Sequence, residues 1–231
     1  DVPHTSHFTI PNSHLSITPP DLMRTLRASH LGSGREAKHW PKPTLPEYAF
    51  IGRSNVGKSS LVNMLVGMNK LARVSGTPGK TRNVEHFRVE PEKGMDGSPW
   101  LLADLPGYGF AKTSQTERAA WRTMIDNYLL NRENLQCVFV LIDVRLEPQS
   151  NDLGMIRWLG ENGIPFVLVF TKADKLKQPS IVSNIALFKR TMKKTWDTLP
   201  QMFITSAESK KGREDLLEFI EGVNAQWSAQ R

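Results

Sequence analysis

The chain has 231 residues, of which 39% are hydrophobic and 23% are charged, a composition typical of a globular protein with one buried core. No apolar run approaches the ~20 residues needed to cross a bilayer, so we expect no membrane insertion. The net charge of +7 favours polyanionic partners such as RNA, or serves solubility alone, and the single cysteine, Cys137, excludes an intramolecular disulfide.

The first 46 residues have the composition of an irregular arm. They contain seven prolines together with Gly32 and Gly34, and these residue types interrupt regular structure. We expect at most a short helix there, near residues 21–29. The chain begins with Asp1 and not with methionine, which indicates processing, trimming or truncation. We therefore predict an arm at residues 1–46 and a single domain at residues 47–231.

From residue 47 onward, short apolar runs alternate with longer amphipathic stretches. In chain order, strands are predicted at residues 48–51, 84–89, 100–103, 138–142, 166–170 and 202–204. Helices are predicted at residues 58–66, 116–130, 152–161, 181–196 and 214–225. This alternation predicts a three-layer α/β fold with a mainly parallel six-stranded sheet. Ligands of such sheets bind beyond the carboxyl ends of the strands, and each motif described below falls at such an end.

The first motif follows the first strand of the predicted domain. The phosphate-binding pattern GxxxxGK[ST] is matched in full by Gly52, Arg53, Ser54, Asn55, Val56, Gly57, Lys58 and Ser59. Its glycines let the backbone wrap around phosphates, and the helix that follows directs its N-terminal N–H groups at the anion. We expect Lys58 to reach the β- and γ-phosphates and Ser59 to ligate Mg²⁺. A chance glycine-rich turn is the alternative, which the strand and helix on either side disfavour.

Two further segments complete the predicted phosphate and metal site. Asp104 ends the strand at residues 100–103, and its carboxylate is expected to contact Mg²⁺ through water. The N–H of Gly107 is expected to face the γ-phosphate. Between these motifs, Thr81 lies in a basic, glycine-rich loop and is predicted to add its hydroxyl to Mg²⁺ while the γ-phosphate is present. Thr77 is the competing candidate, but a proline follows it, and an ordinary turn is the alternative for the loop.

The pattern TKxD after the strand at residues 166–170 indicates guanine recognition. The carboxylate of Asp174 can accept hydrogen bonds from the N1–H and the amine of guanine, a donor pair that adenine lacks. Lys172, which follows Thr171, is expected to lay its alkyl stem along the base. Ser206 and Ala207 follow the last strand, and the Ala207 N–H is expected to meet the guanine O6. A helix start capped by the aspartate is the alternative, but five motifs in the required order favour a guanine nucleotide.

Together these motifs resemble the EngB (YihA/YsxC) family of TrmE-Era-like, translation-associated GTPases over about residues 47–227. The most specific pieces are residues 52–61, 77–81, 104–109 and 171–174. The resemblance implies a Ras-like P-loop fold and a nucleotide site that includes Ser60. It also implies a GTP-hydrolysing switch that assists maturation of the large ribosomal subunit. We therefore expect a monomer whose partners are the rRNA and proteins of the subunit precursor.

The implied reaction converts GTP to GDP and phosphate with Mg²⁺ as cofactor, and its candidate catalytic residues are Asn55, Lys58, Thr81 and Gly107. Tyr108 stands where Ras-like enzymes carry the glutamine that orients the attacking water, so we expect slow intrinsic hydrolysis. In related GTPases an asparagine at the position of Asn55 ligates K⁺ beside the phosphates. The resemblance therefore implies that K⁺ stimulates hydrolysis by offsetting negative charge.

The long arm, the insertion at residues 92–99 and the absent methionine predict an organellar protein, in the mitochondrial matrix or the chloroplast stroma. The bacterial cytoplasm is the alternative. Two other functions stay open: a P-loop kinase or ATPase, which would need no guanine motif, and a GTP-loaded scaffold for RNA or protein with negligible turnover. A basic face on the helix at residues 181–196 is interpreted as solvated surface rather than as an RNA site.

Overall fold

The computed structural model describes residues 25–68, 71, 83–108 and 115–230. Within these residues the strands are β1 (Leu26–Gly34), β2 (Glu47–Gly52), β3 (Val84–Pro91), β4 (Trp100–Asp104), β5 (Leu135–Asp143), β6 (Phe166–Thr171) and β7 (Met202–Ile204). The α-helices are α1 (Lys58–Val66), α2 (Gln115–Asn131), α3 (Ser150–Glu161), α4 (Gln178–Met192) and α5 (Arg213–Ala229). Two short 3-10 helices are η1 (Ala37–His39) and η2 (Ala173–Lys175).

All the described strands belong to one sheet with the order β1-β3-β4-β2-β5-β6-β7. The central strand β2 pairs in parallel with both β4 and β5, and β6 and β7 continue the parallel arrangement. Only the pairs of β3 with β1 and with β4 are antiparallel among the described strands. The predicted mainly parallel, Ras-like α/β fold is confirmed, and each predicted strand and helix is present within four residues of its predicted ends.

The sheet has seven strands rather than the predicted six, because Leu26–Gly34 forms β1. The prediction of an irregular arm with at most a short helix is therefore wrong for these residues. The first part of the predicted helix, residues 21–24, lies outside the described residues. Most of β1 is exposed or half-buried, so its sequence carries no continuous apolar run. At the sheet edge it pairs with β3, with a register shift between His30 and Gly32, and Leu26 and Ala28 pack against the core. The boundary at residue 46 stays a prediction.

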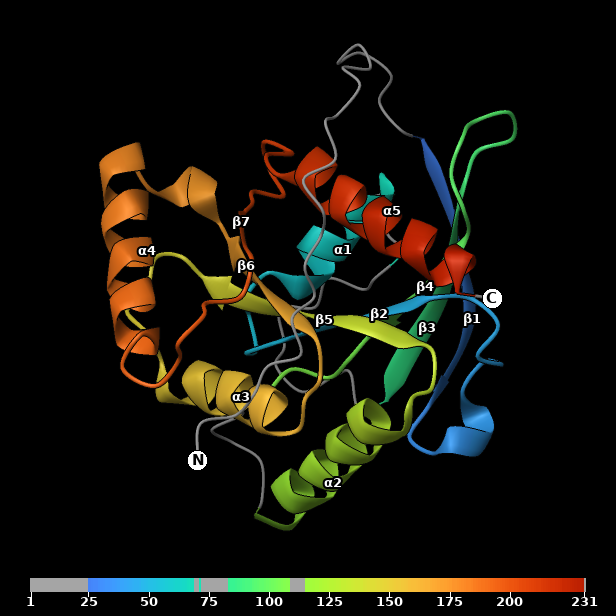
Figure 1. The fold of residues 1–231 in the computed structure, drawn as a ribbon, viewed down its shortest axis with the longest axis horizontal. Helices are drawn as coiled ribbons and strands as arrows, with labels where there is room; N and C mark the ends of the chain where they lie inside the picture. Colours follow the sequence, from blue (N-terminus) through green and yellow to red (C-terminus); the bar gives the residue numbers. More distant parts are fainter. Residues whose placement is uncertain (1–24, 69–70, 72–82, 109–114, 231) are drawn as a thin grey trace.

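Helices cover both faces of the sheet and make the three predicted layers (Figure 1). On one face α1 and α5 bury apolar side chains such as Leu65 and Ile220. On the other face α2, α3 and α4 do the same with Ile125, Leu159 and Phe188. This packing leaves the carboxyl ends of β2, β4, β5 and β6 at one edge, where the loops can gather a ligand. No helix within the described residues is long and apolar enough to span a bilayer.

A buried ionic cluster lies at the opposite end of β2. The Arg132 guanidinium donates to both oxygens of the Glu47 carboxylate, from Nε at 2.8 Å and from Nη2 at 2.7 Å. Its third nitrogen donates to the Pro41 carbonyl at 2.9 Å, so the segment before β2 joins the cluster. The Tyr128 hydroxyl also donates to Glu47 and lies 3.1 Å from Nε2 of His86. The carboxyl end of α2 is thereby fixed to β2 and β3.

Candidate functional site

The phosphate-binding loop runs from the end of β2 into α1, as the motif predicts. Two residues of the loop have left-handed backbone conformations: Asn55, with φ of +62°, and Gly57, with φ of +101°. Gly57 immediately precedes α1, so Lys58, Ser59 and Ser60 form the first turn of the helix. The free N–H groups of that turn, together with the helix dipole, favour a bound anion at this position.

Gly107 brings the loop after β4 against the phosphate-binding loop. A side-chain carbon at Gly107 would lie 3.0 Å from the Gly52 carbonyl oxygen and 3.3 Å from the Ser54 nitrogen, so a larger residue would push the two loops apart. The next residue, Tyr108, donates its N–H to the Gly52 carbonyl at 3.1 Å, and its own carbonyl accepts the Ser54 N–H at 3.1 Å. Two motifs that lie about 50 residues apart in the sequence are therefore joined by a short parallel bridge with Arg53.

The predicted Mg²⁺ ligands partly converge. Asp104 ends β4, is 4% exposed and forms an ion pair with Lys58 of α1. Ser59 follows Lys58 directly in the first turn of α1. A serine hydroxyl and a carboxylate at the mouth of a phosphate-binding loop are the donor set that Mg²⁺ takes together with phosphate oxygens and water, so these residues fit the ion. Thr81, the third predicted ligand, and its competitor Thr77 lie outside the described residues.

A cavity of about 540 Å³ opens between α1, η2 and the loop after β7. Its volume lies within the range of small-molecule sites. Predicted nucleotide-binding residues make up part of its wall: Gly57, Ser60, Thr171, Lys172, Asp174 and Ala207. Met64 and Leu61 of α1 supply an apolar side to the same cavity. A planar base can thus be held between an apolar wall and a carboxylate.

Ser206 and Lys175 fix the carboxylate of Asp174. The Ser206 hydroxyl donates to Oδ1 at 2.7 Å, and Lys175 Nζ lies 2.9 Å from Oδ2. The hydrogen bonds from Ser206 and then Lys175 lower the pKa of Asp174 to about 2 from its ordinary value of 3.8. Asp174 is therefore an ionised acceptor at neutral pH, which guanine recognition requires. Ser206, 1% exposed, serves as the support of Asp174, a role its position in the sequence does not reveal.

Thr171 and Lys172 tie the base side of the site to the phosphate-binding loop. The buried Thr171 hydroxyl donates to the Val56 carbonyl at 2.6 Å and also lies 3.2 Å from the Ile142 carbonyl. Lys172 Nζ donates to the Asn55 carbonyl at 2.5 Å. Thr171 thus bonds to the backbone of the loop that is predicted to bind the phosphates.

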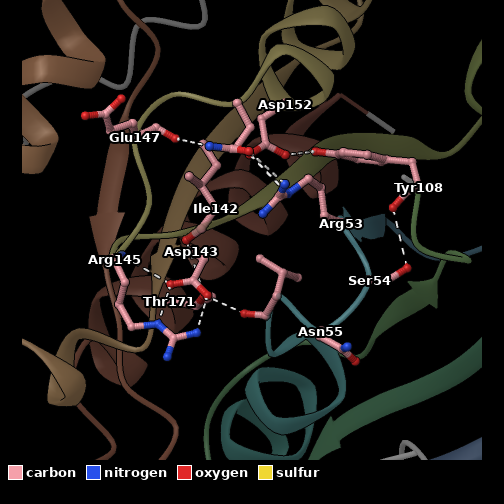
Figure 2. Close-up of polar contacts among 12 residues, drawn as sticks. Arg53, Ser54, Asn55, Tyr108, Ile142, Asp143, Arg145, Glu147, Asp152 and Thr171 are labelled. Carbon is pink, nitrogen blue, oxygen red and sulfur yellow. Dashed lines mark hydrogen bonds and ion pairs between the residues drawn. The ribbon is translucent and has the colours of Figure 1, made fainter. Parts of the chain in front are cut away.

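Asp143, which was not predicted from the sequence, ends β5 in the way that Asp104 ends β4. Its carboxylate accepts hydrogen bonds from Nε and Nη2 of Arg145, at 2.9 and 2.7 Å (Figure 2). It also accepts a hydrogen bond from Lys172 Nζ at 2.9 Å. Burial would raise the pKa of Asp143, but the bonds from Arg145 and Lys172 outweigh it and lower the pKa to about 2. An aspartate directly after an apolar strand was the available signal.

Asp152, in the first turn of α3, was also missed. It accepts the Tyr108 hydroxyl at Oδ1, 2.8 Å away, while Arg53 Nε lies 3.7 Å from Oδ2 (Figure 2). Arg53 also donates to Oε1 of Gln149 at 3.1 Å, so its side chain is directed at α3. The sequence predicts only that a helix begins at Asp152, and no local pattern indicates that Tyr108 and Arg53 are its partners.

Comparison with known proteins agrees with this geometry. A family model described as a 50S ribosome-binding GTPase matches residues 47–172. The probable GTP-binding protein EngB of Bacteroides fragilis is 50% identical over 202 residues, which cover 87% of this chain and 97% of the relative. The chain belongs to the EngB family of GTP-binding proteins. The EngB protein of Porphyromonas gingivalis is 48% identical over the same shares of both chains.

Solved structures agree with the EngB assignment at the level of the fold. A crystal structure of a probable GTP-binding protein EngB has a TM-score of 0.59 and 24% identity, and the match covers 78% of this chain and 99% of that one. Aquifex aeolicus Era, solved with GDP and AlF₄⁻, has a TM-score of 0.63 and 20% identity, with 77% and 56% covered. Membership of the EngB family makes GTP and GDP the ligands of the site and implies GTPase activity with Mg²⁺. The roles of single residues stay predictions.

Proposed function

We propose that this protein is a slow, GTP-hydrolysing switch that assists assembly of the large ribosomal subunit. The main support is the description of its matching family model, a 50S ribosome-binding GTPase, over residues 47–172, which include the phosphate-binding loop, Asp104 and Gly107. The net charge of +7 adds support, because a ribosomal precursor is a polyanion. In this proposal the partners are the rRNA and proteins of the precursor, and the protein acts as a monomer.

In the proposed reaction each loop has a separate task. Lys58 and the N–H groups of the first turn of α1 bind the β- and γ-phosphates and neutralise charge that develops in the transition state. Ser59, Asp104 and Thr81 would hold Mg²⁺, which supplies Lewis-acid stabilisation of the phosphate oxygens when bound. The Gly107 N–H contacts the γ-phosphate, and Asp174 with Ala207 reads the guanine.

Slow turnover is supported by the position of Tyr108. Its side chain is 6% exposed and its hydroxyl is bonded to Asp152, so it does not orient an attacking water as glutamine does. Burial and the adjacent Asp152 carboxylate raise the pKa of the phenol well above 10.0, which keeps it neutral. Water must therefore be activated without a side chain at this position.

We further propose that K⁺ bound at Asn55 offsets part of the negative charge of the phosphates. Asn55 is exposed on the phosphate-binding loop. Lys172 donates to its backbone carbonyl, so the hydrogen bond does not involve the side-chain amide. Hydrolysis should be faster in KCl than in NaCl at equal ionic strength, and Asn55→Ala should remove the difference. Equal turnover of the unmodified protein in both salts would refute the K⁺ site and leave the GTPase intact.

The decisive experiment for the ribosomal role is sedimentation with purified ribosomal subunits in GTP, GDP and a non-hydrolysable GTP analogue. We expect association with the large subunit in the triphosphate states and release after hydrolysis. Asp174→Ala, which should not retain guanine nucleotide, serves as the control. No association in any state would refute the ribosomal role, whereas equal association in all states would favour a scaffold without a switch.

The cellular location is proposed separately. The relatives named above are bacterial proteins, which supports the bacterial cytoplasm. An organellar matrix or stroma stays a prediction from the sequence. Fractionation of the source cells with an antibody to this protein would separate the two.

A further inference from the structure

A buried carboxylate on α3 joins the two loops that surround the expected γ-phosphate position. Asp152 is 2% exposed, yet neither of its two partners belongs to α3: Tyr108 follows Gly107 in the loop after β4, and Arg53 lies in the phosphate-binding loop. Figure 2 shows the two side chains reaching the carboxylate from different directions. An aspartate in the first turn of a helix often serves only the helix dipole. Here its oxygens face residues from outside the helix.

The side-chain contacts act on the same residue pair as the backbone contacts. Arg53 and Tyr108 are paired in a parallel bridge, closed by hydrogen bonds of 3.1 Å on either side. Asp152 then binds the side chains of both members of that pair. Gly107 lies directly before Tyr108, where the two loops approach closely: an added side-chain carbon at Gly107 would lie 3.0 Å from the Gly52 carbonyl oxygen.

We infer that Asp152 is a positioning residue for the GTPase reaction, which holds Gly107 against the phosphate-binding loop through Tyr108 and Arg53. The inference rests on the proposed contact of the Gly107 N–H with the γ-phosphate. Since GDP lacks that phosphate, weakening the Asp152 contacts should cost affinity for GTP and leave affinity for GDP. A general packing role would instead change both affinities, or only the thermal stability.

The test compares GDP with a non-hydrolysable GTP analogue by calorimetric titration of the full chain. Tyr108→Phe removes one hydroxyl and retains the ring that packs 6.5 Å from Trp121. We expect the Kd for the analogue to rise about tenfold, as for a lost hydrogen bond to a charged group, with the Kd for GDP within about twofold. Single-turnover hydrolysis at saturating GTP should also slow.

Tyr48→Phe is the matched control. Tyr48 is also buried, and its hydroxyl donates to Oδ1 of Asn224 at 2.7 Å, between β2 and α5 and away from both loops. Its loss should lower the melting temperature and leave the ratio of the two Kd values unchanged. If Tyr108→Phe also leaves that ratio unchanged, or weakens GDP and the analogue equally, Asp152 has no positioning role.

A second variant tests whether the effect passes through Asp152. Asp152→Asn keeps the shape and removes the charge, and it should change the Kd ratio in the same direction as Tyr108→Phe. If both act through one bond, the double variant should show clearly less than the product of the two single effects. Independent, multiplying effects would overturn the inference. Should Asp152→Asn fail to fold, the result of Tyr108→Phe still decides it.

Discussion

The buried pair of Glu47 and Arg132 gives the sharpest stability prediction. Arg132→Met keeps most of the side-chain volume but leaves the Glu47 carboxylate, 0% exposed, without its cation. Breaking a buried ion pair by removing one partner costs about 3–5 kcal/mol, because an uncompensated charge stays inside. At about 2–4 °C per kcal/mol for a chain of this size, the melting temperature should fall by about 6–20 °C.

Urea unfolding followed by circular dichroism measures this loss, and an exposed pair supplies the control. Arg88 and Glu90 form a comparable contact at 2.9 Å with side chains 41% and 40% exposed, so Arg88→Met should cost at most about 1 kcal/mol. The double variant Glu47→Leu with Arg132→Met should be more stable than Arg132→Met alone, since it buries no lone charge. A loss for Arg132→Met no larger than that for Arg88→Met would refute this account of the cluster.

Three further predictions concern ligand choice and pH. Asp174→Ala should weaken GDP binding by at least about thirtyfold, or about 2 kcal/mol, and leave the weak binding of ADP unchanged in calorimetric titrations. The pKa of Asp143 is depressed from 3.8 to about 2, so its contribution to stability is complete above pH 3.8 and is lost as the pH falls through 2. Asp143→Asn should therefore reduce the pH dependence of the melting temperature between pH 3.8 and 2. Burial lowers the pKa of His86 from 6.5 to about 4, so as the pH falls the unfolded state binds the proton before the folded state does. The free energy of unfolding should therefore fall, by up to about 3 kcal/mol, as the pH drops from 6.5 to 4. His86→Gln should remove most of that slope in urea titrations at fixed pH values.

The parts of the fold that the sequence predicts are those with a continuous apolar signal. The strand β5 is apolar and buried over most of its length, and the amphipathic repeat of α4 is regular, so both were found near their true ends. The edge strand β1 has neither feature. It is held by backbone bonds to β3, a partner about 60 residues away, and no local pattern reports such a pairing.

The same distinction separates the predicted site residues from the missed ones. Phosphate binding needs several backbone groups of one loop, so its residues are contiguous and form a recognisable motif. The partners of Asp152 come from other loops and lie near it only after folding. Asp143 has one partner two residues away, Arg145, but its contact with Lys172 also forms only on folding. Ser206 was predicted as a site residue because it precedes Ala207. Its hydrogen bond to Asp174 depends on how β6 and β7 pair, which the sequence does not indicate.

The bonds of Thr171 and Lys172 to the backbone of residues 55 and 56 have a consequence for nucleotide discrimination. The segment predicted to contact the base and the segment predicted to contact the phosphates are linked by a hydroxyl and an ammonium group, so neither can shift without the other. A nucleotide whose base cannot donate hydrogen bonds to Asp174 would therefore also meet a displaced phosphate-binding loop. If Asp174 reads the guanine as predicted, both ends of the ligand would then contribute to the rejection of adenine nucleotides.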